Sequence, residues 1–190
     1  MSQIDTSKPI VDQIKTTITG LKDGLKNYPI RDLVKHAEKF GPYLKQQRLE
    51  TNQVRKFLDA INQIKALLAQ QDEDKNLQEE LEIIQKQAEK EKQAIQENND
   101  FGSEKLILNV KNIQKQADDK KDKLIFGKIE ADIVLLKPKL AYAAARQRSA
   151  KPLEEVISIA IDKVESTKDF ERLVQFIESI IAYHKAEGGK

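Results

Sequence analysis

The helical character of this chain is decided by residues 51–71, which read TNQVRKFLDAINQIKALLAQQ. Apolar side chains recur in this stretch every three or four residues, which is the spacing of one face of an α-helix. Thr51 belongs to the residue types that cap helix N-termini, so we expect the helix to begin there. The predicted buried face comprises Val54, Phe57, Leu58, Ile61, Ile64, Leu67 and Leu68.

Two further helices are predicted on the N-terminal side of this stretch, and a proline marks the start of each. The first begins after Ser7 and has Pro9 in its first turn, where a missing backbone N–H costs little. The second opens at Pro29. We expect Gly41-Pro42 to interrupt it, because proline breaks an α-helix.

Three more helical segments are predicted towards the C-terminus. The first continues from Leu124 and contains Pro138, which is expected either to kink the helix or to restart it. The second opens at Lys151-Pro152. The third is capped by Ser166 or by Thr167, since either hydroxyl can accept a hydrogen bond from the first helical turn.

Residues 75–123 differ from the rest of the chain because Gln, Glu, Lys and Asn dominate them. Their sparse apolar residues follow a narrow seam that breaks at residues 98–102. Two narrow-striped helices joined by a turn predict an antiparallel, coiled-coil-like hairpin. We interpret it as an insertion into a single helical domain of residues 1–190. The predicted seam comprises Leu77, Leu81, Ile84, Ala88 and Ile95, then Leu106, Val110, Ile113 and Ala117.

The composition favours the same fold class. Apolar residues make up 39% of the 190 residues, whereas aromatic residues make up 5% and Trp is absent. A core of Leu, Ile, Val and Ala suits packed helices better than a β-sandwich, whose strands favour aromatic and β-branched residues. We therefore predict an all-α protein, built as a compact bundle of about five core helices that carries the inserted hairpin.

The N-terminus and the hydropathy pattern favour a cytoplasmic protein with no membrane partner. The opening MSQIDTSKP lacks the basic and then apolar pattern of a signal peptide. No stretch approaches the roughly 18 apolar residues that a membrane helix requires. The absence of Cys excludes disulfides and thiolate metal sites in this sequence.

Nothing in the sequence indicates an enzyme. The two histidines are His36 and His184, and no HExxH, GxSxG, Walker or GxGxxG motif occurs. The carboxylates fall on Glu/Lys-rich helix surfaces, which are usually solvated. We therefore predict no catalytic residue, no metal, no cofactor and no small-molecule substrate. For His184 we expect a structural role or simple exposure, with a favourable helix-dipole interaction when it is protonated.

The charge distribution is more informative than the net charge of +2. One basic segment spans residues 45–56, which contain four cations and one acid. A sharper one spans residues 133–153, which hold five cations and no acid. By contrast, residues 72–100 hold ten acids and four lysines, so this part should avoid phosphates. The five cations of the sharper segment are Lys137, Lys139, Arg146, Arg148 and Lys151.

Such a basic stretch on a nearly neutral chain is typical of phosphate contact. A solvated surface that happens to be basic is the alternative explanation. Tyr142 stands among these cations. It has the chemistry to stack on a base, although we expect it to fill the core.

Three motifs carry a family resemblance. The segment LLKPKLAYAAAR (residues 135–146) and the C-terminal run DFERLVQFIESIIAYHK (residues 169–185) resemble two signatures of the small helical subunit of the type III-A CRISPR effector, the Csm complex. The segment TNQVRKF (residues 51–57) resembles a third, weaker one. The motifs occur in the expected order and cover the core helices, whereas the arm at 75–123 is longer than the usual connection.

The resemblance implies a non-catalytic, RNA-binding small subunit of a type III-A interference complex that acts in antiviral defence. Several copies are expected to stack along the guide RNA–target RNA duplex and to contact its backbone through a basic face. Its implied partners are guide RNA, target RNA, the other Csm subunits and further copies of itself. In such complexes base pairing reads the sequence, while protein contacts hold the backbone.

The expected RNA contacts follow from the matching motifs. Arg55, Lys137, Lys139 and Arg146 fall within them, and Arg148 is added on local charge alone. The alternative hypothesis is a coiled-coil adaptor that oligomerises or docks a partner through the 75–123 hairpin and does not bind RNA. That hypothesis predicts oligomers that are lost when the hairpin is deleted.

Overall fold

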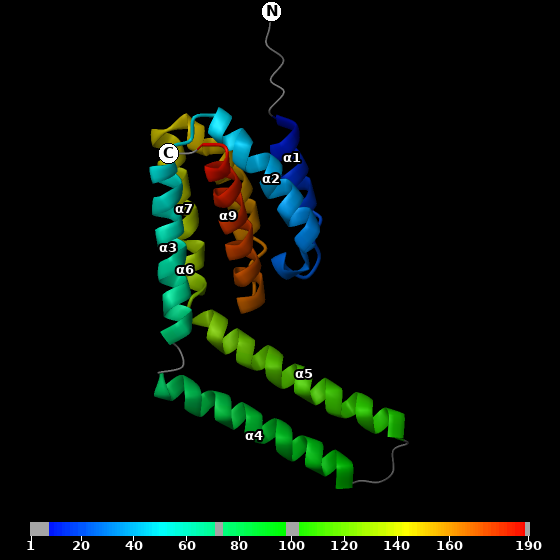
Figure 1. The fold of residues 1–190 in the computed structure, drawn as a ribbon. Helices are drawn as coiled ribbons and strands as arrows, with labels where there is room; N and C mark the ends of the chain where they lie inside the picture. The colour runs from blue at the N-terminus through cyan, green and yellow to red at the C-terminus, as the bar shows by residue number, and fades with distance from the viewer. Residues whose placement is uncertain (1–7, 71–73, 98–102, 189–190) are drawn as a thin grey trace, which may run out of the picture. The chain divides into compact units, whose positions relative to one another are not determined.

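Every regular element of the computed structural model is helical within the residues that it describes, which are 8–70, 74–97 and 103–188 (Figure 1). The prediction of an all-α protein is therefore confirmed. The elements are α1 (Lys8–Thr19), η1 (Leu25–Asn27), α2 (Ile30–Gln46), α3 (Thr51–Gln70), α4 (Lys75–Glu97), α5 (Ser103–Gly127), α6 (Glu130–Val134), α7 (Leu136–Arg146), η3 (Arg148–Ala150), α8 (Lys151–Ile161) and α9 (Thr167–Ala186).

Internal contacts divide the chain into two units. The bundle unit contains the chain up to residue 65 and from residue 130 onward, and the hairpin unit contains residues 66–129. Helix α3 crosses this boundary, so its part up to Lys65 belongs to the bundle unit. The interpretation of the hairpin as an insertion into a single domain stays a prediction.

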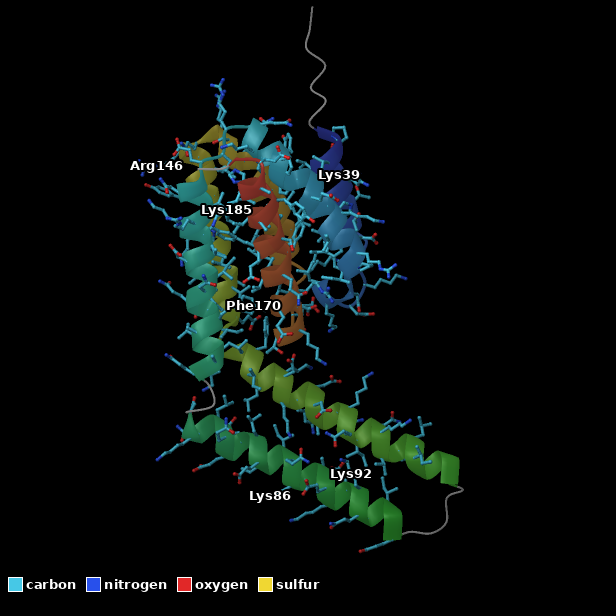
Figure 2. The ribbon with its side chains drawn as sticks, viewed as in Figure 1. Lys39, Lys86, Lys92, Arg146, Phe170 and Lys185 are labelled. Atoms are coloured by element: carbon cyan, nitrogen blue, oxygen red, sulfur yellow. The ribbon has the colours of Figure 1, made fainter. Side chains whose placement is uncertain are left out.

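The core of the bundle unit forms where α2 packs along α9. Helix α2 buries Leu33 and Phe40, and α9 buries Phe170 and Phe176. Figure 2 labels Phe170 on α9. Burial of one such side chain contributes about 1.5–3 kcal/mol to stability, so this pair anchors the fold. Helix α8 extends the core, because both α1 and α7 pack against it.

Helix α2 continues through Gly41-Pro42, so the predicted interruption there is wrong. A Cβ atom on Gly41 would lie 2.6 Å from the backbone N of His184 and 2.9 Å from the carbonyl O of Ile180. Gly41 is therefore the point at which α2 approaches the α9 backbone. Burial of the apolar face of α2 on α9 outweighs the one backbone hydrogen bond that Pro42 removes.

Pro138 restarts the helix, which was one of its two predicted effects. Helix α6 ends at Val134 and α7 begins at Leu136, so Pro138 lies in the first turn of α7. Its missing N–H needs no partner there. In a continuous helix the proline ring would instead clash with the carbonyl of Val134, four residues earlier.

The start of α9 is fixed by a buried carboxylate. Ser166 caps the helix, as predicted, because its Oγ accepts a hydrogen bond of 3.2 Å from the backbone N of Asp169. The Asp169 carboxylate accepts hydrogen bonds from Ser166 Oγ (2.5 Å) and from the backbone N of Lys26 (2.6 Å) and Glu165 (3.2 Å). This buried charge is therefore satisfied, and it joins α9 to η1.

Both histidines are buried in the bundle unit and have structural roles. The Tyr28 hydroxyl and His36 Nδ1 share a hydrogen bond of 2.5 Å, and His184 Nε2 donates one of 3.0 Å to the carbonyl of Leu49. Burial lowers the pKa of both imidazoles, because an apolar interior disfavours the charged form. A neutral His184 gains little from the helix dipole, so its hydrogen bond to Leu49 is the contact that matters.

The hairpin unit consists chiefly of α4 and α5, which pack against each other in antiparallel directions (Figure 1). Lys121 Nζ donates a hydrogen bond of 2.6 Å to Gln85 Oε1, and Lys92 donates one to Gln114. From Gln85 to Lys92 the residue numbers rise along α4, while those of their partners fall from Lys121 to Gln114 along α5, which defines the antiparallel register.

Two members of the predicted seam face each other in the hairpin unit. Ala88 of α4 and Ala117 of α5 are both buried and stand opposite each other in this register. Small side chains at this level let the two helices approach closely. The turn predicted at residues 98–102 lies outside the described residues.

Candidate nucleic-acid interface

An open cavity of about 620 Å³ lies in the bundle unit between α3 and α7. Three cations line it, namely Lys56 of α3 and Lys139 and Arg146 of α7, against a single acid, Glu50. Within the described part of the chain, none of the three cations has an ion-pair partner. The surroundings of the cavity therefore favour an anion.

The helical repeat explains why these residues share one cavity. Asn52 and Lys56 stand four residues apart on α3, and both line the cavity. Lys139, Tyr142 and Arg146 follow one another at steps of three and four residues on α7, and all three line it as well. Residues at these spacings lie on one helix face, so each helix presents a single polar stripe to the cavity.

Arg146 is held over Tyr142 by two contacts. Its guanidinium donates a hydrogen bond of 3.1 Å to the Tyr142 hydroxyl, and its Cζ atom lies 5.6 Å from the ring centroid. The Tyr142 side chain is 65% exposed, so the expectation that it fills the core is wrong. Leu136 and Leu140 occupy the buried face of α7 instead. Figure 2 shows Arg146 at the periphery of the bundle unit.

The lining of the cavity also includes buried apolar side chains and one buried polar atom. Phe57, Leu140 and Leu153 line the cavity and are buried. Gln147 also lines it, and its buried Oε1 atom has no hydrogen-bond partner in the described structure. A buried polar atom without a hydrogen-bond partner lowers the stability of the fold by about 1–3 kcal/mol, so such atoms are rare in folded proteins.

The structure brings together some of the predicted RNA contacts and separates others. Lys139 and Arg146 line the cavity, whereas Arg55 and Arg148 are exposed near its walls on α3 and η3 without lining it. Lys137 is half-buried, and its Nζ atom lies 2.6 Å from Oδ1 of Asp162.

Sequence reasoning missed Lys56 as a member of this group. Lys56 follows Arg55 directly and belongs to the basic segment at 45–56, so its charge was visible in the sequence. What brings it to Lys139 and Arg146 is the packing of α3 near α7. The two basic segments are separated by more than 70 residues of sequence, and no local pattern reveals that they meet.

The described residues form neither a metal-binding cluster nor a membrane-spanning helix. Among residues 8–70, 74–97 and 103–188, no group of three or more His, Asp or Glu side chains is placed to hold a metal ion. Over the same ranges, every helix is too short or too polar to cross a membrane.

The Csm2 Type III-A family model matches this chain over residues 27–103 and 104–190. The chain belongs to this family. As a Csm2 family member it is a structural small subunit of the type III-A Csm complex, and the other subunits of that complex are its partners. The resemblance inferred from the three sequence motifs is thereby confirmed. Comparison with curated proteins and with solved structures finds no match.

Proposed function

We propose that this Csm2 family member holds the RNA backbone within the Csm complex through a basic surface on α3, α7 and η3. We define the basic surface as Arg55, Lys56, Lys139, Arg146 and Arg148. Several copies would lie along the guide RNA–target RNA duplex, as the family resemblance implies. In this role the subunit is non-catalytic, works in the cytoplasm and serves antiviral defence.

The observation that carries the proposal is the convergence of three unpaired cations from two helices on one cavity. Clustered Lys and Arg side chains without carboxylate partners are the usual means of binding phosphates independently of sequence. Arg146 can grip two phosphate oxygens with its planar fork, whereas Lys56 and Lys139 act as point charges.

Lys137 is proposed as an outlying contact. It precedes Arg146 by nine residues on α7, which places it about 13 Å away along the helix axis. Its ion pair with Asp162 is partly exposed to solvent, because the two side chains are 34% and 59% exposed. Such pairs contribute only about 0–1 kcal/mol, so a phosphate can replace the Asp162 carboxylate at little cost.

The proposal is tested by reconstituting the Csm complex with a Lys56→Ala/Lys139→Ala/Arg146→Ala subunit and measuring target RNA affinity over a range of salt concentrations. Loss of three phosphate contacts per copy should weaken binding and reduce the slope of log K against log salt by about 2–3 per copy. The weakening should be largest at low salt, where counterion release contributes most.

The matched control is Arg31→Ala/Lys35→Ala/Lys168→Ala. It removes the same charge from exposed positions of α2 and α9 that do not line the cavity. This control should retain most of the affinity and the salt slope. If both triple variants lose the same affinity, the effect is one of net charge and the proposed basic surface is wrong.

A second candidate function rests on the hairpin unit. Ile83 of α4 and Ile107 and Leu108 of α5 are large apolar side chains that are 54%, 53% and 57% exposed. Exposed apolar side chains on a narrow helical pair favour a docked partner helix. The coiled-coil adaptor hypothesis therefore keeps a specific observation in its favour.

The two functions are distinguished by an Ile83→Ser/Ile107→Ser/Leu108→Ser variant studied by light scattering and RNA binding. An adaptor requires a wild-type oligomer that this variant dissociates, together with no RNA affinity in either protein. A wild-type monomer that binds RNA rejects the adaptor. A variant that still assembles normally rejects it as well.

A further inference from the structure

We infer that the cavity between α3 and α7 receives one unstacked nucleobase of the bound RNA, so that the subunit holds a base as well as phosphates. This inference rests on the proposed function, because it requires RNA on the basic surface. It deepens that function, since a protein that holds only the backbone has no need for a cavity beside its cations.

The size and lining of the cavity suit a nucleobase. Its volume of about 620 Å³ falls within the range of roughly 300–1,000 Å³ that is typical of small-molecule sites. Phe57, Leu140 and Leu153 supply apolar surface inside it. The two faces of a nucleobase are apolar and flat, so they suit such walls.

Gln147 supplies an acceptor that has no partner. Gln147 Oε1 is buried at the cavity and receives no hydrogen bond within the described part of the chain. The amino and imino N–H groups on the edge of a base are donors. Protein atoms cover this oxygen in the observed conformation, so a base inside the cavity would satisfy it once the Gln147 side chain turns its amide towards the cavity.

The exposed side chains around the cavity suit the rest of a nucleotide. The exposed ring of Tyr142, held by Arg146, offers a face on which a base can stack as it enters. Lys56 and Lys139 offer cations for the phosphates on either side of that base. The cavity thus offers apolar walls for the faces of one base, Gln147 for its polar edge, and Lys56 and Lys139 for the adjacent phosphates.

A protein side chain is a poorer occupant of this cavity. An apolar side chain would fill the same space, but it would leave three cations without an anion and Gln147 without a donor. An acidic side chain would bring an anion but no donor for Gln147 and no flat apolar surface. The combination of groups therefore favours RNA.

The test compares two oligomers that carry the same charge, using the full chain with methyl-labelled leucines. One oligomer is a 12-nucleotide single-stranded oligouridylate, and the other is an abasic ribose-phosphate oligomer of equal length. With a base in the cavity, the oligouridylate should shift the Leu140 and Leu153 methyl resonances by its ring current, and the abasic oligomer should not. Oligouridylate should also bind at least about fivefold more tightly.

A variant at Gln147 isolates the cavity from the cations. Gln147→Leu removes the unpartnered acceptor at nearly constant volume, so we expect equal or higher thermal stability. We also expect about fivefold weaker binding of oligouridylate, with binding of the abasic oligomer unchanged. The matched control is Gln175→Leu on α9, an exposed position away from the cavity, which should change neither affinity.

Failure of this inference differs from failure of the proposed function. If both oligomers bind equally and the methyl resonances do not move, the base site is wrong. The proposed function then still stands if the Lys56→Ala/Lys139→Ala/Arg146→Ala variant weakens binding of both oligomers more than its control does. If neither oligomer binds the wild-type chain, both proposals fall.

Discussion

The guanidinium of Arg146 donates a hydrogen bond of 3.1 Å to the hydroxyl of Tyr142 and lies over its ring. One of its five N–H donors is thus engaged, and the others remain available to an anion. A cation that is already oriented loses less side-chain entropy when it binds a phosphate. Tyr142 is therefore a positioning residue for Arg146 as well as a surface on which a base can stack.

We predict that Tyr142→Phe weakens RNA binding by the Csm complex about two- to tenfold. The ring remains, but Arg146 loses the hydrogen bond that orients it, and ordering a mobile side chain costs about 0.5–1.5 kcal/mol. The salt slope should stay unchanged, because every charge is retained. Unaltered affinity in a filter-binding titration would show that Tyr142 does not position Arg146.

The close approach of α2 to α9 predicts that Gly41→Ala is destabilising. The added methyl group would meet the backbone of His184 and Ile180, which cannot move aside as a flexible side chain can. We expect a loss of about 1–3 kcal/mol in the free energy of unfolding, measured by urea denaturation. Gly127→Ala is the control, because a methyl group added there would meet nothing within 4 Å. A Gly41→Ala protein as stable as this control would disprove the close approach.

The buried carboxylate of Asp169 predicts a second destabilising change. In Asp169→Asn, the amide NH₂ replaces one acceptor oxygen and faces a donor, namely the backbone N of Lys26, the backbone N of Glu165 or the hydroxyl of Ser166. We expect a loss of about 1–3 kcal/mol, measured as a lower urea midpoint. Asp12→Asn, at an exposed position of α1, is the control and should be nearly neutral.

Gly24 lies beside the buried carboxylate of Asp169. Its φ of 96° belongs to the left-handed region that favours glycine. A Cβ atom there would also lie 2.7 Å from Oδ2 of Asp169. Gly24→Ala should therefore lower the urea midpoint, through backbone strain and through displacement of the carboxylate. A urea midpoint equal to that of the wild-type protein would show that Gly24 is not required beside the Asp169 carboxylate.

Stability should fall as the pH drops below about 6.5, the usual pKa of histidine. Burial holds the pKa of His36 and His184 below this value in the folded chain. In this pH range the unfolded chain binds more protons than the folded one, so acid favours unfolding. The stabilisation is fully present above about pH 6.5 and is lost as the pH falls through the lowered pKa values.

Urea midpoints measured between about pH 7.5 and about pH 5.5 check this dependence. A His36→Gln/His184→Gln variant should be less stable at neutral pH, because it disturbs the hydrogen bonds to Tyr28 and Leu49. Its midpoint should nevertheless change less over this range than that of the wild-type protein. Equal slopes for the two proteins would mean that the buried histidines do not carry the effect.

Much of the fold was predictable because its signals are local. The apolar repeat of residues 51–71 predicted the helix that the structure shows as α3, and the Ser166 hydroxyl predicted the start of α9. Pro138 predicted either a kink or a restart, because its effect depends on the residue four positions earlier, and the structure shows the restart at α7. The interruption predicted at Gly41-Pro42 was wrong, because Gly41 allows a close contact between α2 and α9, which are distant in sequence.

The candidate site was predictable only in part. Lys139 and Arg146 were identified from local charge and from a motif, and they do line the cavity. The role of Lys56 depends on the packing of α3 near α7, and the pairing of Lys137 depends on Asp162, which follows α8. Such relationships arise from tertiary structure, and no spacing along the chain encodes them.

Recovery of RNA with the tagged chain, from cells that express its Csm complex, tests most directly whether this subunit contacts RNA through Lys56, Lys139 and Arg146. Three proteins would be purified in parallel: the wild-type protein, the Lys56→Ala/Lys139→Ala/Arg146→Ala variant and the Arg31→Ala/Lys35→Ala/Lys168→Ala control. The RNA bound to each would be sequenced, and the bound subunits would be identified. The account predicts guide RNA and Csm subunits with wild-type protein and control, and markedly less RNA with the first variant. Equal RNA recovery from all three proteins, or no guide RNA and no Csm subunit with any of them, would contradict it.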